Sequence, residues 1–387
     1  MSDSDSPLPP NEPAPASAKR PDEDLSSLSP QLNPGKMEES RQFEERGFTE
    51  NSFRVPSAPV LSHHEAATKY RHRRRRQLRL CIFLFLSTWV STTLVGSGFV
   101  PLVALPGFFD TELQETILAD FSKGQISPSD RNQVFSEWYS GLLMQGFSYS
   151  IPLMLILLCH EMGHFLQAVR YRVPASFPFF IPLPIPPLGT MGAVIAQGRG
   201  AADRKQMFDI AVSGPLAGLF VTLPILYFGI EASHFEFEFL MAGRYVEFGE
   251  PLIIQWFITW IHGPTPNGQI LVMHGMAHAG WVGIFVTALN LIPIGQLDGG
   301  HLAYTLLGKP AHWIAFAVVF AAAGYMIATG TYSYILFLIL ILVMGMRHPP
   351  TRDDTVSLGT FRHVLGWLTL AFLLIGFTPT PIVIGQG

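Results

Sequence analysis

An apolar stretch that carries three ionisable side chains within five positions constrains the fold of this chain most. Residues 151–170 begin with an apolar run and continue into His160-Glu161-Met162-Gly163-His164. An ionisable group at bilayer depth costs roughly 2.5–3.5 kcal/mol on insertion scales. A buried helix with two satisfied histidines is the alternative interpretation, but three such groups need strong compensation. Metal coordination supplies that compensation, so the stretch predicts a metal site inside an apolar helix.

The spacing within this motif matches a known arrangement of metal ligands. Residues four apart lie on one face of a helix, so the imidazoles of His160 and His164 can bind one Zn²⁺ ion. Glu161 follows the first histidine and can take a proton from a water molecule at the ion. The sequence therefore predicts two zinc ligands and a catalytic base within five residues.

The composition indicates a membrane protein rather than a soluble one. Of the 387 residues, 48% are hydrophobic, only 14% are charged and 30 are Phe. A chain this apolar fits several membrane spans. Cys81 and Cys159 both lie in apolar runs, so no disulfide framework is expected.

The N-terminal part contains two contrasting polar segments before the first apolar one. Residues 1–68 are rich in Pro, Ser, Asp, Glu and Asn, and they predict a disordered tail that resembles neither a signal peptide nor a transit peptide. Residues 69–79 are basic and directly precede an apolar anchor, residues 80–104. We interpret the basic run as a juxtamembrane segment that is attracted to anionic lipid. Nucleic-acid binding is the alternative, and no nucleic-acid partner is expected.

Seven apolar segments predict an all-α polytopic membrane protein with about seven transmembrane helices. The segments are residues 80–104, 139–168, 207–230, 275–293, 311–329, 332–346 and 362–384. With seven spans, the basic clusters all fall on one side, which the positive-inside rule makes cytoplasmic, and the acidic loops 105–137 and 231–268 fall on the other. The N-terminus is then cytoplasmic. The apolar piece 251–262 is too short to span a bilayer.

Residues 174–198 contain six prolines in an apolar context. Prolines at this density forbid a helix. Non-helical backbone at membrane depth survives only when it is buried in protein or lines a wet cavity. We therefore expect a re-entrant extended segment beside the metal, with a Pro-rich surface linker as the alternative.

A catalytic zinc ion takes three protein ligands and leaves one position open for water. The candidates for the third ligand are Asp298, His301, His274 and His278. We favour Asp298, because it is a carboxylate at the end of an apolar span. Gly299 and Gly300 would also let the backbone leave helical geometry and approach the site. An acid at a helix end that faces the cytoplasm is the alternative.

Two further patterns lie in the apolar segments. Asn290 is placed two helical turns before Asp298, and its amide can donate to a developing oxyanion or hold a substrate strand. We favour this substrate-binding role over a simple hydrogen bond between helices. Gly214 and Gly218 form G-x-x-x-G, which indicates a close helix-packing face rather than a catalytic element.

Together these motifs resemble the site-2 protease family of intramembrane zinc metalloproteases, the M50-type peptidases. The matching residues are His160-Glu161-x-x-His164 in one span and Asn290-x-x-Pro293-x-x-x-Leu297-Asp298-Gly299 in a later one. The Pro-rich segment 176–194 and residues 213–218 are similar to the EGY-like and bacterial subgroup, and no inserted PDZ-like domain is evident. The resemblance covers residues 139–303. It implies that His160, His164 and Asp298 hold zinc, that Glu161 is the base and that a re-entrant hairpin lies near the site.

The resemblance implies an intramembrane zinc endopeptidase that hydrolyses peptide bonds of membrane-protein substrates, as in regulated intramembrane proteolysis. Its partners would be transmembrane protein substrates and the lipid bilayer, in a bacterial inner membrane; no oligomeric state is indicated. We expect a catalytic core at 139–303, after the tail, the basic segment and the anchor, and C-terminal transmembrane helices at 304–387. The alternatives are a zinc transporter that uses the same ligands and a non-catalytic membrane scaffold.

Overall fold

The computed structural model describes residues 63–98, 128–198, 200–237 and 244–386. The chain divides into two units, residues 1–67 and 68–387. The predicted disordered tail lies outside the described residues up to residue 62, whereas residues 63–68 are helical. The acidic loop predicted at 105–137 lies outside them up to residue 127.

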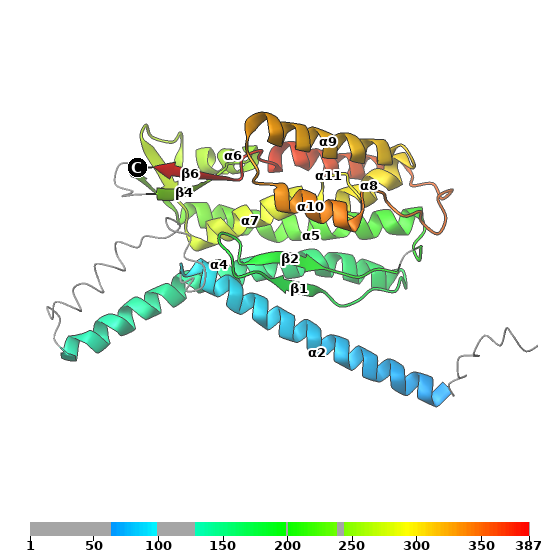
Figure 1. Ribbon diagram of the computed structural model, residues 1–387, viewed down its shortest axis with the longest axis horizontal. Coiled ribbons are helices and arrows are strands. Elements are labelled where there is room, and N and C mark those ends of the chain that lie inside the picture. The colour runs from blue at the N-terminus through cyan, green and yellow to red at the C-terminus, as the bar shows by residue number, and fades with distance from the viewer. Residues whose placement is uncertain (1–62, 99–127, 199, 238–243, 387) are drawn as a thin grey trace, which may run out of the picture. The chain divides into compact units, whose positions relative to one another are not determined.

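The described residues are mostly helical, as the sequence predicts (Figure 1). They contain nine helices: α2 (His63–Gly96), α4 (Pro128–Arg170), α5 (Arg204–Glu231), α6 (Leu252–His262), α7 (Gly275–Asn290), α8 (Asp298–Leu307), α9 (Ala311–Thr329), α10 (Ile335–Met344) and α11 (Thr360–Gly376). They also contain six short strands: β1 (Phe179–Pro182), β2 (Thr190–Val194), β3 (His234–Phe237), β4 (Arg244–Phe248), β5 (Gln269–Val272) and β6 (Ile382–Gln386). The strands form three two-stranded sheets, β1–β2, β3–β5 and β4–β6, so the expectation of an all-α protein is wrong in this respect.

Among the described residues, four helices have the length and apolar composition needed to cross a bilayer. They cover Arg74–Gly96, Tyr139–Arg170, Arg204–Glu231 and Ala311–Thr329. These helices overlap four of the predicted spans, and the end of the first, 80–104, lies outside the described residues from residue 99 on. The helices in the other three predicted spans, α7, α10 and α11, have 16, 10 and 17 residues. A helix needs about 20 residues to cross a hydrocarbon core that is roughly 30 Å thick. These three helices therefore fall short of a full crossing by themselves.

Prolines account for two of the shortened helices. The segment predicted as a span at 362–384 is helical only to Gly376, because Pro379 and Pro381 follow and a helix rarely continues through the residue before a proline. The chain then enters β6, which pairs with β4 in antiparallel register. In the same way α7 ends at Asn290, three residues before Pro293.

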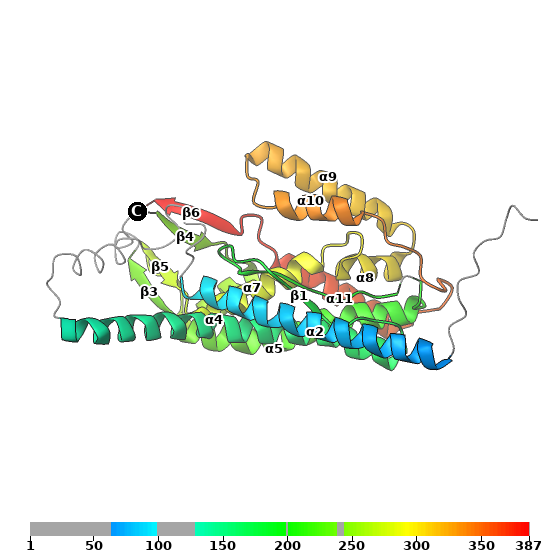
Figure 2. The ribbon, with the colours of Figure 1, turned by 60° about the horizontal axis from the view of Figure 1, so that its bottom comes forward.

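Helices α4, α5 and α7 pack against one another and position the site (Figures 1 and 2). Their shared core contains large side chains with at most 1% of their surface exposed: Tyr149, Leu153, Leu226, Trp281 and Ile284. Helix α8 packs on α5 and α11. The start of α5 is fixed by a capping box, in which the Asp203 side chain accepts from the Gln206 N–H and the Gln206 side chain accepts from the Asp203 N–H.

The Pro-rich segment forms the antiparallel hairpin β1–β2, in which Phe179 lies opposite Val194. Two side chains from other helices hold its turn. The Ser91 hydroxyl of α2 donates to the Gly189 carbonyl at 2.7 Å, and the Tyr149 hydroxyl of α4 donates to the Leu188 carbonyl at 2.7 Å. The segment is therefore extended, as its prolines predict, and it is anchored to the helix that carries the histidine motif.

Candidate metal centre

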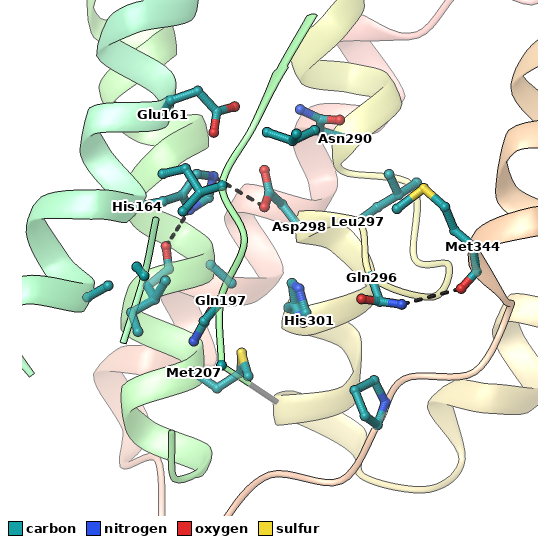
Figure 3. Close-up of a pocket in the computed structure, with 18 of the residues that line it drawn as sticks. Glu161, His164, Gln197, Met207, Asn290, Gln296, Leu297, Asp298, His301 and Met344 are labelled. Carbon is teal, nitrogen blue, oxygen red and sulfur yellow. Dashed lines mark hydrogen bonds and ion pairs between the residues drawn. The ribbon is translucent and has the colours of Figure 1, made fainter. Parts of the chain in front are cut away.

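Three potential metal ligands from two helices converge in one pocket (Figure 3). His160 and His164 lie on α4, and Asp298 is the first residue of α8. The Nε2 atom of His160 lies 3.2 Å from Asp298 Oδ2, and the Nε2 atom of His164 lies 3.3 Å from Asp298 Oδ1. The two Nε2 atoms are 3.3 Å apart. In the part of the chain that the structure describes, this is the one cluster of three such side chains close enough to share an ion.

These separations fit a zinc ion. Zinc binds nitrogen and carboxylate oxygen at about 2.0–2.2 Å with tetrahedral geometry, which places neighbouring donor atoms about 3.3–3.6 Å apart. The three donor separations are 3.2, 3.3 and 3.3 Å. Two imidazoles and one carboxylate also leave one tetrahedral position for water, which is the composition of catalytic rather than structural zinc sites. The donor set therefore matches the metal that the sequence predicts.

A backbone carbonyl of α5 fixes the orientation of one histidine ring. His164 Nδ1 lies 2.7 Å from the carbonyl oxygen of Ile210. A carbonyl can only accept, so Nδ1 carries the hydrogen and Nε2 keeps its lone pair for a metal. The Ser213 hydroxyl donates toward the same carbonyl at 2.8 Å and toward the Gly163 carbonyl at 3.0 Å, which ties α5 to α4 beside the ligand.

The G-x-x-x-G pattern on α5 lies directly against the two histidines. A Cβ atom at Gly214 would lie 2.0 Å from His164 Nε2, and one at Gly218 would lie 3.0 Å from His160 Nδ1. The glycines are four residues apart, as the histidines are, and each faces one imidazole across the helix pair. The sequence pattern indicated only a packing face, and this matching four-residue spacing is the signal that links it to the metal site.

Replacing Gly214 by Ala should remove zinc while leaving the helix bundle folded. The added methyl group would lie 2.0 Å from His164 Nε2, so the imidazole must move away from its position, and we expect zinc affinity to fall by roughly 100-fold or more. Metal content measured after purification in detergent gives the readout. Gly324→Ala is the matched control, because a Cβ at that position in α9 meets no atom within 4 Å and its zinc content should equal that of the wild type. Equal zinc content in both variants would contradict this role of Gly214.

Gly299 and Gly300 were expected to let the backbone leave helical geometry, and the structure gives them a different role. They lie inside α8 rather than in an irregular segment. A Cβ at Gly299 would lie 2.0 Å from the Leu291 carbonyl oxygen, and one at Gly300 would lie 2.6 Å from the Gly295 carbonyl oxygen. The glycines therefore let the first turn of α8 press against the preceding loop, which brings Asp298 to the histidines without breaking the helix.

Asn290 lines the same pocket, but the backbone between it and Asp298 differs from the prediction. It is the last residue of α7, and a non-helical turn separates it from Asp298, so the expected spacing of two helical turns is wrong. Pro293 within that turn explains the interruption. The Asn290 side-chain nitrogen lies 3.5 Å from His160 Nε2.

The other candidates for the third ligand do not join the cluster. His274 caps the N-terminus of α7, where its Nδ1 accepts from the Met276 N–H at 3.3 Å, whereas Asn290 ends the same helix near the cluster. His278 stacks on Tyr149 with ring centroids 4.6 Å apart. His301 does line the pocket, yet its Nδ1 lies 2.5 Å from a nitrogen of another histidine rather than at the cluster.

The remaining walls of this pocket, which has a volume of about 230 Å³, come from α4, the chain around β2, the start of α5 and the segment at the end of α10. Glu161 is 6% exposed and lines it beside the histidines (Figure 3). Gln197, just after the hairpin, also lines it, and its buried side-chain nitrogen has no hydrogen-bond partner among the described residues. Sequence reasoning did not single out Gln197, because no local motif contains it.

The fold and the site define a helical membrane protein with the donor set of a zinc hydrolase. Residues 148–329, just under half of the chain, match the model of peptidase family M50. It is 30% identical over 233 residues to a protein named probable zinc metalloprotease EGY1, chloroplastic, of Oryza sativa subsp. japonica; the match covers 59% of this chain and 39% of the relative. It is 28% identical over 233 residues to the EGY1 protein of Arabidopsis thaliana, covering 59% and 41%, and 25% identical over 256 residues to EGY2 of the same plant, covering 62% and 43%. The matched region thus spans about two fifths of the length of these curated relatives.

Proposed function

We propose that this chain is an intramembrane zinc endopeptidase that hydrolyses peptide bonds of membrane-protein substrates. The observation that carries the proposal is the meeting of His160, His164 and Asp298 at 3.2–3.3 Å, with Glu161 lining the same pocket. Three of these four residues lie on an apolar helical stretch of 32 residues that is long enough to cross a bilayer. The match of residues 148–329 to the model of peptidase family M50 and the similarity to relatives named zinc metalloproteases support the same function.

In this proposal the two histidines and Asp298 hold the zinc ion, and Glu161 is the general base. A bound zinc ion acts as a Lewis acid that acidifies water and polarises a carbonyl group. Glu161 takes a proton from the attacking water, whose oxygen bonds to the scissile carbonyl carbon. Glu161 then delivers that proton to the amide nitrogen as the C–N bond breaks. The Asn290 side-chain amide donates a hydrogen bond to the substrate carbonyl oxygen.

The substrate must reach this pocket in an extended form. The hydrogen bonds of a transmembrane helix cover its carbonyl groups, so the helix has to unwind before hydrolysis. Residues 193–195, at the end of β2 and just beyond it, line the pocket. In the described two-stranded sheet, β1 pairs with one edge of β2, and the other edge of β2 has no partner strand. We propose that the unwound substrate segment adds to β2 as a strand, which presents a peptide bond to the ligand cluster.

The topology that goes with this function has about seven spans and a cytoplasmic N-terminus. In it, α7, α10 and α11 join the four long helices as shorter membrane segments, and the β1–β2 hairpin is re-entrant beside the catalytic core 139–303. Short helices of this kind can be accommodated where neighbouring helices cover their ends or the bilayer thins. We place the protein in a bacterial cell membrane, whereas the printed names of the plant relatives assign them to the chloroplast.

Reconstituted protein can test peptidase activity against the two alternatives. Full-length protein in proteoliposomes, mixed with solubilised and re-inserted cell membrane proteins, should generate new protein termini inside apolar segments. Removal of metal with a zinc chelator should abolish these termini, and added zinc should restore them. Zinc flux across the vesicle without cleavage would identify a transporter instead. Binding of membrane proteins with neither cleavage nor flux would identify a scaffold.

A further inference from the structure

A second pocket, with a volume of about 390 Å³, lies where α8, the start of α9 and the segment after α10 meet. It is separate from the candidate metal centre and is lined mainly by cationic and aromatic side chains: Tyr304, Lys309, His312, Trp313, Arg347 and His348. In the sequence these residues are spread over three segments, so no local motif reveals the pocket.

The fixed charge of this pocket is positive. Neither Lys309 nor Arg347 forms an ion pair with any residue that the structure describes. Burial lowers the pKa of His348 to about 3, so this imidazole is neutral and contributes no charge. Asp354 is the acid that approaches the pocket wall, and its carboxylate already accepts hydrogen bonds from the Tyr304 hydroxyl at 2.8 Å and the Thr351 hydroxyl at 2.6 Å.

The rim of the pocket has the chemistry of a membrane interface. Trp313 is 77% exposed in the first turn of α9, a helix long enough to cross a bilayer. The guanidinium carbon of Arg347 lies 5.7 Å from the ring centroid of Phe316, one turn further along α9. Tryptophan together with Lys and Arg at the end of a span marks the level of the lipid headgroups. Beyond this rim the outer face of α9 is apolar and exposed at Phe320 and Ile327.

We propose that this pocket binds the phosphate of an anionic phospholipid, with Lys309 and Arg347 on the phosphate and the acyl chains along the exposed face of α9. Lysine supplies a point charge and arginine a planar pair of donors, which is how proteins commonly hold phosphate. The apolar face below the cations selects a lipid over a free phosphate ion, because only a lipid fills both parts of the site.

The proposed lipid site adjoins the wall of the candidate metal centre. His348 Nε2 lies 2.5 Å from Nδ1 of His301, and His301 lines the catalytic pocket. Pro350 lines both pockets. A phospholipid held by Arg347 therefore steadies the segment that forms one side of the catalytic pocket.

Native mass spectrometry of the full-length protein in detergent can test the site. We compare the binding of phosphatidylglycerol and phosphatidylcholine, with inorganic phosphate as a competitor. The double variant Lys309→Gln/Arg347→Gln should bind phosphatidylglycerol roughly 30-fold more weakly than the wild type. This factor corresponds to the loss of two cations, each of which attracts an anionic lipid. The control Lys205→Gln/Arg352→Gln removes two charges from exposed positions outside the pocket and should bind as the wild type does.

Each outcome decides the proposal. Equal retention of the two lipids by the wild type, or unchanged binding in Lys309→Gln/Arg347→Gln, overturns it. Displacement of phosphatidylglycerol by millimolar phosphate, with the phosphate bound in its place, identifies a free-phosphate site and overturns the lipid assignment. If the double variant aggregates, the exchange Lys309→Arg/Arg347→Lys decides: it keeps both charges and should retain one phosphatidylglycerol, and loss of that lipid in the folded protein overturns the proposal.

Discussion

Replacing Glu161 by Gln is expected to abolish peptide cleavage while the protein keeps its zinc. The amide has nearly the shape of the carboxylate but cannot accept a proton from the attacking water. General-base catalysis contributes roughly 10²–10⁴-fold, so cleavage should fall by at least about 100-fold. Zinc should stay at the wild-type level, because Glu161 lies outside the cluster of His160, His164 and Asp298. The two readouts are cleavage of re-inserted membrane proteins and metal content by mass spectrometry.

The control for this change is Glu231→Gln, which makes the same substitution at the exposed last residue of α5. It should leave both cleavage and zinc content unchanged. Wild-type activity in Glu161→Gln would reject the assigned base. A loss of zinc from Glu161→Gln would instead show that Glu161 takes part in holding the metal, which the cluster of three donors does not predict.

Replacing Asp298 by Ala should remove zinc and cleavage together. This substitution deletes one of three proposed protein ligands and leaves two imidazoles on α4. Losing a supporting partner of a ligand already costs roughly 10–100-fold in metal affinity, and losing the ligand itself should cost more. We expect no retained zinc after dialysis and no detectable cleavage. Zinc content and cleavage therefore fall together here, whereas they separate in Glu161→Gln.

Asp353→Ala is the control for Asp298→Ala, because its carboxylate is exposed in the loop before α11 and does not line the catalytic pocket. It should behave as the wild type. Full zinc content in Asp298→Ala would mean that another residue completes the ligand set. His301 is then the first to examine, because it lines the same pocket.

The local part of the site was predictable from the sequence, because it depends on a short helical repeat. His160, Glu161 and His164 share one helix, so their spacing alone places the two imidazoles together. Asp298 could be proposed from its residue type and its apolar context. Its position relative to the histidines depends on how α4, α5, α7 and α8 pack, and no local pattern encodes that packing.

The parts that were missed depend on contacts between distant segments. The strands β3 and β5 are separated by α6 in the chain, so neither shows the short turn that marks a hairpin. The role of Gly214, which leaves room for the His164 ring, depends on the packing of α5 against α4, and the sequence does not reveal that packing. The proline signals were more informative, because they fix backbone conformation locally: they predicted the extended segment that forms β1–β2, and Pro293 explains where α7 stops.

The proposed ligands come from positions far apart along the chain, since Asp298 follows His160 by 138 residues. Synthesis from the N-terminus delivers α4 to the bilayer well before α8 has left the ribosome. During that interval the nascent chain carries His160, Glu161 and His164 but not Asp298. Under the proposed function, the nascent chain therefore has an incomplete zinc site, and cleavage becomes possible only after α8 has packed on α5.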